Sequence, residues 1–241
     1  MKINGNNAIK SDPGSVTDYK EFQINDYMVI GDEHVGTSTE TPMRNDAFDM
    51  SDNEKMDRIS YHFRKIMETM GLDLKDDSLN GTPRRVAKMF INEIFYGLDP
   101  KNKPSATLFE NKYGYNEMLV EKNIKVHSYC EHHFVPIVGK AHVAYISNGK
   151  VIGLSKINRI VDYFSRRPQV QERLTIQIAE ELKKVLQTDD VAVVIDSAHM
   201  CVITRGVKDV NSSTVTASYH GKFKDADTRK EFLGHISEKQ S

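Results

Sequence analysis

The sequence has little cysteine, almost no net charge and no long apolar run. Two cysteines among 241 residues exclude a disulfide framework and indicate a reducing compartment, which predicts a cytoplasmic protein. A formal net charge of -1 gives no overall basic field for nucleic acid or an anionic membrane surface. No stretch approaches the roughly 20 apolar residues that a membrane-spanning helix needs. The chain also begins without an apolar block after a basic start, so we expect no signal peptide.

The rest of the composition is typical of a soluble globular protein, with 39% hydrophobic and 28% charged residues. Residues 1–52 are rich in Asn, Asp, Ser, Thr and Gly, which predicts a partly disordered extension. Residues 53–241 carry the periodic apolar patterns of a folded chain. We therefore expect a single domain over 53–241, with helices within 53–97 and a sheet-containing body over 117–223.

Two helices are expected before the body. Apolar residues recur at spacings of three and four up to Ile66 and Met70, which predicts a helix whose apolar face is buried. A second helix is expected to begin with Thr82 as its N-cap and to end at Gly97.

The body alternates between strand and helix patterns in an order that predicts an α+β fold. Asn148-Gly149 is typical of a two-residue hairpin turn, so the segments on its two sides are expected to pair. Pro168 is expected to separate two helices, the first of them capped by Ser155. The order strand, strand, helix, helix, strand, strand implies an antiparallel sheet with the helices on one face. The expected strands are 118–126, 139–146, 150–154, 191–203 and 213–219, and the expected helices are 155–166 and 169–186.

Both cysteines have a histidine close by in the sequence. Cys130 and His133 are spaced to supply two metal ligands from one turn, and Cys201, expected on a distant strand, would supply a third. Three protein ligands leave one zinc position open for water, which is typical of a catalytic site. The alternatives are that the cysteines are small buried hydrophobes, or that they form a disulfide in an oxidised sample.

Two further histidines lie next to these ligands. His132 adjoins His133, and His199 is expected on one strand face with Cys201. Because imidazole titrates near neutral pH, both histidines suit proton transfer beside a metal site. Support of the ligands, or a hydrogen-bonded core position, is the alternative, and it is the interpretation preferred for His142.

A second group of polar residues could bind an anion and a flat heterocycle. Ser155 and Lys156 at a helix N-terminus suit a phosphate, and Arg159 and Arg205 add positive charge. Gln171 and Glu172 offer donors and acceptors, and a carboxylate matches the paired N–H groups of guanine. Taken singly, each of these residues is more often an exposed helix charge, as are the basic residues around Arg85.

Several long motifs in this order are similar to those of the zinc-dependent GTP cyclohydrolase I family. The motifs are Cys130–His133, Gly153–Arg159, Arg167–Thr175 and His199–Cys201, preceded by Thr82–Met89. The resemblance implies that GTP and water become dihydroneopterin triphosphate and formate, the first step of pterin and folate synthesis. It also implies a tunnelling fold, in which antiparallel sheets of several copies close into a barrel. The implied assembly is a homodecamer with active sites between subunits.

The resemblance also implies a role for each candidate residue. Zinc would be held by Cys130, His133 and Cys201. His132 would protonate a purine nitrogen, His199 would act at the ribose ring oxygen, and Ser155 would assist the carbohydrate rearrangement. The residues implied for guanine are Gln171 and Glu172, and those implied for the triphosphate are Lys156, Arg159, Arg205 and Arg85 of a neighbouring copy. The rival hypothesis is a non-catalytic pterin- or nucleotide-binding module of the same fold with a structural zinc.

Overall fold

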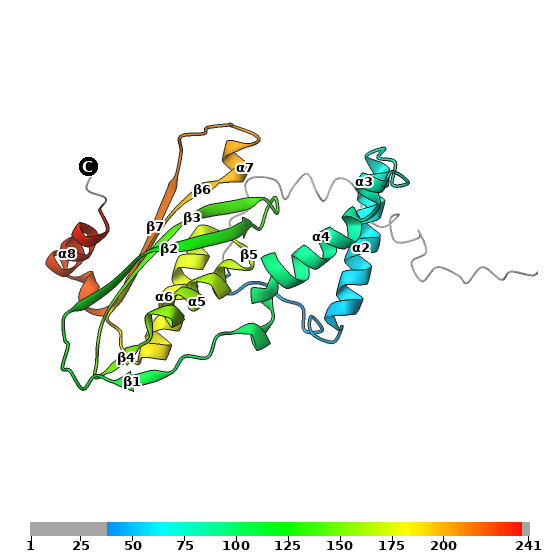
Figure 1. Cartoon of the computed structure of the whole chain (residues 1–241). Coiled ribbons are helices and arrows are strands. Elements are labelled where there is room, and N and C mark those ends of the chain that lie inside the picture. The colour runs from blue at the N-terminus through cyan, green and yellow to red at the C-terminus, as the bar shows by residue number, and fades with distance from the viewer. Residues whose placement is uncertain (1–37, 238–241) are drawn as a thin grey trace, which may run out of the picture. The chain divides into compact units, whose positions relative to one another are not determined.

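A five-stranded sheet with the order β5-β2-β3-β6-β7 positions the rest of the chain (Figure 1). The structure is a computed structural model that describes residues 38–237, so the predicted extension before residue 38 lies outside the described residues. Neighbouring strands are antiparallel, except that the two-residue β5 pairs in parallel with the end of β2. The strands are β2 (Met118–Cys130), β3 (Pro136–Ile146), β5 (Pro168–Gln169), β6 (Val191–His199) and β7 (Thr214–Tyr219).

Helices α5 (Leu154–Ser165) and α6 (Gln171–Leu186) pack on one face of this sheet (Figure 1). Their apolar residues recur at helical spacing, so one side of each helix can be buried against the strands. Fully buried residues of this main core include Ile157, Leu174, Ile178, Leu182, Val193 and Ile195. The α+β class and the two-helix insert predicted from the sequence are therefore confirmed.

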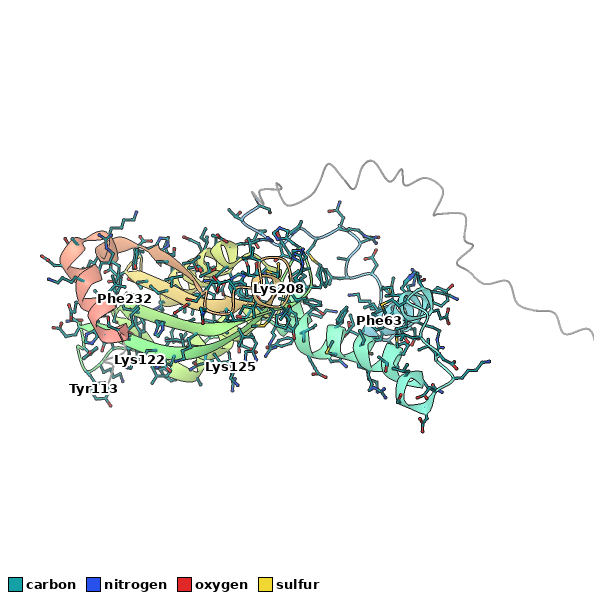
Figure 2. All side chains as sticks on the ribbon, turned by 90° about the horizontal axis from the view of Figure 1, so that it is seen from above. Phe63, Tyr113, Lys122, Lys125, Lys208 and Phe232 are labelled. Atoms are coloured by element: carbon teal, nitrogen blue, oxygen red, sulfur yellow. The ribbon has the colours of Figure 1, made fainter. Side chains whose placement is uncertain are left out.

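The opposite face of the sheet is covered at one end by the C-terminal segment. A short turn, η5 (Gly221–Lys224), leads into α8 (Ala226–Ile236). Phe223 and Phe232, the latter labelled in Figure 2, meet edge to face at 5.8 Å and are fully buried. Both rings belong to a second, smaller core cluster with residues of β3 and β6. Each face of the sheet thus has its own apolar cover.

The N-terminal helices begin close to the predicted positions. Ser51 caps α2 (Asp52–Thr69) through a capping box with Glu54. After the short α3 (Asp77–Asn80), α4 (Thr82–Met89) is capped by Gly81 rather than by the predicted Thr82. The helical path continues through η2 (Phe90–Ile94), η3 (Tyr96–Leu98) and η4 (Pro100–Asn102). In the described part of the chain, 38–237, no helix is long and apolar enough to cross a membrane.

The predicted burial of the α2 apolar face is only partly correct. Met56 and Met67 are buried, but Ile66 and Met70 are 52% and 63% exposed. Helical periodicity identifies the apolar side of a helix, but it does not say how much of that side a single chain covers.

The predicted hairpin around Asn148-Gly149 is wrong in its partner. The turn is present, with Gly149 at φ +81°, but β4 (Lys150–Ile152) pairs with β1 (Leu108–Glu110) and not with β3. Strand β1 lies between the predicted N-terminal helices and the predicted body, where no strand was expected. A turn motif therefore fixed the chain reversal here without fixing which strand receives the returning chain.

Three element ends also differ from the predictions. Gly153, not Ser155, occupies the cap position of α5. Pro168 does not restart a helix directly but opens β5, and α6 begins at Gln171. The strand expected over 191–203 ends at His199 and continues as a helical turn, α7 (Met200–Ile203). This last difference moves Cys201 from a strand to a helix.

Candidate metal centre and active site

The first two metal-ligand candidates lie where β2 turns into β3. The turn is closed by two backbone hydrogen bonds, Phe134 N–H to Cys130 O at 2.8 Å and Cys130 N–H to Val135 O at 2.9 Å. Phe134 adopts φ +54°, which reverses the chain tightly. As a result His133 folds back on Cys130, with Nδ1 3.8 Å from Sγ. The spacing of two intervening residues thus serves to bring both ligands to one point.

The pairing of β6 with β3 brings Cys201 to this point. His199 at the end of β6 pairs with Ile137 near the start of β3, so α7 begins beside the β2–β3 turn. The ligand atoms of Cys130, His133 and Cys201 all lie within 4.8 Å of one another. The structure therefore assembles the predicted ligand set, although Cys201 comes from a helical turn instead of the expected strand.

The chemistry of this group fits a metal ion. Both cysteines are free thiols, and Cys130 is buried. Burial, and the neighbouring Cys130 thiol, raise the pKa of the Cys201 thiol. Two sulfur atoms crowded together in a poorly solvated place repel each other once ionised, and a cation between them removes that repulsion. These three side chains can hold a metal ion.

The three candidate ligands Cys130, His133 and Cys201 are called the metal group below. Arg205, four residues after Cys201, contacts this group through His133. Its Nη1 lies 2.6 Å from His133 Nε2, on the side of the ring away from Cys130. The guanidinium can only donate, so this contact requires an unprotonated Nε2. An imidazole that gives Nδ1 to a metal carries its proton on Nε2, so a bound ion would release Arg205 for another partner.

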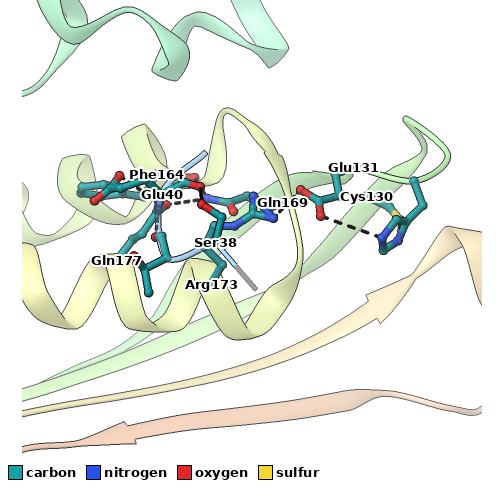
Figure 3. A network of polar contacts seen from close by, with 10 residues as sticks. Ser38, Glu40, Cys130, Glu131, Phe164, Gln169, Arg173 and Gln177 are labelled. Carbon is teal, nitrogen blue, oxygen red and sulfur yellow. Dashed lines mark hydrogen bonds and ion pairs between the residues drawn. The ribbon is translucent and has the colours of Figure 1, made fainter. Parts of the chain in front are cut away.

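His132 extends from the same turn and meets a carboxylate. Its Nδ1 lies 3.8 Å from Cys130 Sγ, and its Nε2 lies 3.8 Å from Glu131 Oε1. The other oxygen of Glu131 accepts a hydrogen bond from Arg173 Nη2, and Figure 3 shows Glu131 between this arginine and Cys130. Glu131 had no role predicted from the sequence. A carboxylate inside a run of ligand-type residues was the available signal.

His199 is held by Gln171, the first residue of α6. His199 Nε2 and Gln171 Oε1 are 2.7 Å apart. Burial lowers the pKa of His199, and the nearby carboxylate of Glu172 partly offsets this effect. The Gln171 side chain is 1% exposed and is bonded inside the protein, and its predicted contact with guanine stays a prediction. Glu172 is exposed at the helix start and remains available to a ligand.

The remaining substrate-binding candidates do not meet the metal group within one chain. Ser155, Lys156 and Arg159 lie at the start of α5, whose Asn158 contacts Glu121 on β2. Glu121 precedes Cys130 by nine residues of extended strand, which corresponds to about 30 Å. Figure 1 shows the same separation, with α7 and β4 toward opposite ends of the sheet. The predicted polar group is therefore divided in this chain, because Arg205 lies beside His133 while Ser155, Lys156 and Arg159 lie at the start of α5.

Arg85 is bonded within its own N-terminal segment. Its Nη2 donates to Ser78 O at 3.1 Å and to Thr82 Oγ1 at 3.0 Å, so in this chain it closes the start of α4. His142, the predicted structural histidine, accepts from Asn123 N–H at 3.4 Å and is 8% exposed. That interpretation agrees with its place in the middle of β3.

Comparison with known proteins adds a family to this geometry. The family model described as GTP cyclohydrolase I matches residues 59–237. A protein named GTP cyclohydrolase 1 from Flavobacterium johnsoniae is 59% identical over 207 residues, covering 86% of this chain and 93% of that protein. A protein of the same name from Aeromonas salmonicida is 56% identical over 198 residues, covering 82% of this chain and 90% of that protein. On the strength of these matches and of the Cys-His-Cys group within them, the chain belongs to the GTP cyclohydrolase I family.

Proposed function

We propose that the chain hydrolyses GTP to dihydroneopterin triphosphate and formate, the first step of pterin and folate biosynthesis. The observation that carries the proposal is the convergence of Cys130, His133 and Cys201, with His132 and His199 beside them. Family membership supplies the reaction, and this convergence supplies a place for it. The reaction opens the guanine imidazole ring and then rearranges the ribose, so it needs an activated water and at least one proton donor.

The metal in this site is proposed to be zinc. Two thiolates and one imidazole are donors of the kind that zinc prefers, and the described residues provide three ligands, not four. Zinc bound here supplies a Lewis acid that lowers the pKa of water and polarises the bond under attack. The proposed location is the cytoplasm, a compartment in which cysteines stay reduced.

The side chains around the metal group divide into proton-transfer and binding roles. His132 and His199 approach the site from the β2–β3 turn and from β6, so they can act on two different parts of a substrate. Exposed Glu172 is proposed to accept the ring N–H and amino group of guanine. Arg205 is proposed to bind the triphosphate once a metal ion has taken His133 from it.

Neighbouring copies are proposed to complete the site. Ser155, Lys156 and Arg159 lie about a strand length from Cys130, and Arg85 is bonded at the start of its own helix, so their predicted roles are proposed to involve a second molecule. The sheet has β7 at one edge, and most of β2 is free at the other edge because β5 pairs with only its last two residues. Open edges of this kind must be paired or covered. Pairing of these edges between copies, as in the tunnelling fold and the family's decamer, would cover the open strands. It would also supply the site residues of a second molecule.

The rival hypothesis, a binding module with a structural zinc, is favoured less. A structural zinc site is closed by four protein ligands, whereas three converge within residues 38–237. A module that only binds a pterin would also not need the buried hydrogen bond with Gln171 that holds the His199 ring in place.

Incubation of zinc-loaded protein with GTP, followed by oxidation and measurement of pterin fluorescence, tests the proposal. We expect fluorescent product from the wild type and formate in equal amount. Cys201→Ser should lose bound zinc by metal analysis and form no product, because two ligands hold the ion much less tightly than three. Met200→Leu, a change next to it without a ligand atom, is the control. Zinc-loaded wild type that forms no pterin would contradict the proposed function, and full zinc in Cys201→Ser would contradict the ligand assignment.

A further inference from the structure

Both the nitrogen and the oxygen of the Gln171 side-chain amide are bonded inside the protein. It projects from the first turn of α6 into the space between β6 and β7 and is 1% exposed. Its Nε2 lies 3.1 Å from Ile195 O, 2.8 Å from Thr214 O and 3.1 Å from Thr216 Oγ1. Its Oε1 lies 2.7 Å from His199 Nε2. A buried amide whose nitrogen and oxygen both have protein partners is held in place by the protein itself.

The partners also fix which way round the amide stands. Backbone carbonyl oxygens can only accept, so the side facing Ile195 and Thr214 must be the NH2 group. The side facing His199 is then the carbonyl oxygen, which can only accept as well. His199 Nε2 must therefore carry a hydrogen and donate it to Gln171. Two strand carbonyls thus determine the state of an imidazole that they do not touch.

Two threonine hydroxyls fix the backbone around the Gln171 amide. Thr175 Oγ1 donates to Gln171 O at 2.8 Å, and it also lies 2.6 Å from Thr216 Oγ1. The start of α6 is therefore tied to β7 independently of the amide. Gln171 is the member of this group that reaches His199.

We propose that Gln171 is a positioning residue for His199. It fixes the ring rotation and the Nε2–H tautomer, and so leaves Nδ1 as the nitrogen that is free to face the substrate. This inference rests on the proposed function only in requiring that His199 takes part in the reaction. It replaces a guanine contact of the Gln171 side chain with an indirect role, exerted through a second side chain.

The test compares Gln171→Met in the wild type and in His199→Ala. Methionine is close to glutamine in length, but its sulfur is only a weak acceptor for the imidazole. We expect kcat to fall about 10- to 100-fold, because a misoriented proton-transfer group loses most of its effect. KM for GTP and the zinc content should stay close to the wild-type values. In the His199→Ala background the same change should lower kcat less than about 2-fold, since the residue through which it acts is gone.

Thr216→Val is the matched control. It removes one of three acceptors around the Gln171 nitrogen and leaves the bond to His199 in place, so kcat is expected to change less than about 3-fold. If Gln171→Met does not fold, Gln171→Leu, which also removes the acceptor for His199, replaces it in both backgrounds with the same expected results.

Three results would overturn the proposal. The first is a rise in KM without loss of kcat, which would return Gln171 to the substrate. The second is an equal loss of kcat with and without His199, which would make the role of Gln171 purely structural. The third is an unchanged kcat in His199→Ala. A wild type without pterin formation is a separate result, because it removes the proposed function and not this relation alone.

Discussion

Arg173 is a buried cation, and its charge is balanced by the carboxylate of Glu131, the one ion-pair partner it has among residues 38–237. Its side chain is 4% exposed, that of Glu131 is 19% exposed, and the two are bonded through Nη2. The other guanidinium nitrogens, Nε and Nη1, are buried without a partner among residues 38–237. A charge in such a place is stable only while its counter-charge stays in position. Because Glu131 adjoins Cys130, this ion pair also anchors the turn that carries two of the metal ligands.

Arg173→Met should therefore destabilise the protein strongly. Removing one partner of a buried pair leaves the other uncompensated, and the expected loss is about 3–5 kcal/mol in the free energy of unfolding. Urea denaturation measures this loss. The control is Arg84→Met, whose partner Asp57 is 72% exposed, and it should cost less than about 1 kcal/mol.

The double variant Arg173→Met with Glu131→Gln separates charge from packing. It should recover part of the stability lost in Arg173→Met, because no unpaired carboxylate remains. Equal losses for Arg173→Met and Arg84→Met would show that the buried pair has no special weight.

At the scale of elements, Gly97 shows how a correct residue can be given the wrong reason. The sequence predicted it as the stop of a helix. In the structure it lies against the end of α5, where an added Cβ would stand 2.0 Å from Tyr163 O and 2.8 Å from Arg166 O. Its N–H donates to Arg166 O at 3.0 Å, and its O accepts from Arg167 Nε at 2.8 Å. Glycine is needed here for close approach between two backbones.

Gly97→Ala should push α5 and the η3 turn apart. Overpacking against backbone atoms has no flexible side chain to absorb it, so we expect a loss of roughly 1–3 kcal/mol in the free energy of unfolding. Thermal and urea unfolding would both detect it. Gly234→Ala in α8 is the opposite case, with open space around the added methyl group, and it should be neutral or stabilise by up to about 1 kcal/mol. A loss in Gly234→Ala as large as that in Gly97→Ala would contradict the steric explanation.

The sequence predicts elements well where one residue pattern determines them. The periodic cores of α5 and α6, and the alternation in β3, needed no knowledge of the rest of the fold. Strand β1 is only Leu108–Glu110 and exists because β4 lies beside it, so no local pattern could reveal it. Val202 and Ile203 favour a strand by propensity, yet they lie in the helical turn that carries Cys201. The predicted ligands still come together despite this error, because the prediction rested on residue types and not on the backbone conformation.

At the scale of the whole molecule, the metal group and the anion-binding candidates of α5 occupy opposite ends of the sheet. Residue chemistry could group Lys156 and Arg159 with Arg205, but it could not say that a strand length separates them. A site that uses both ends is therefore proposed to combine two copies of the chain. This requirement leads to a test that does not depend on knowing the number of subunits.

Mixed oligomers of two inactive variants should regain activity. Cys201→Ser lacks the metal end and Arg159→Ala lacks the anion-binding end, so a mixed assembly contains some sites built from two intact halves. Random assortment predicts about one quarter intact sites when two copies build each site. Co-expression followed by the pterin assay measures the gain over each variant alone. The control mixture, Cys201→Ser with Cys130→Ser, damages the same half twice and should stay inactive, and equal inactivity of both mixtures would contradict shared sites.

The origin of the ligands also gives the metal a topological role. Cys130 and Cys201 enclose β3, both covering helices and β6, so an ion bound between them closes this whole stretch into a ring. Such a closure reduces the freedom of the unfolded chain much as a cross-link does, but a chelator or a proton can reverse it. The ion that the reaction needs would then also stabilise the folded state. A molecule that lost this metal would at the same time become easier to unfold, so loss of activity and loss of stability would occur together.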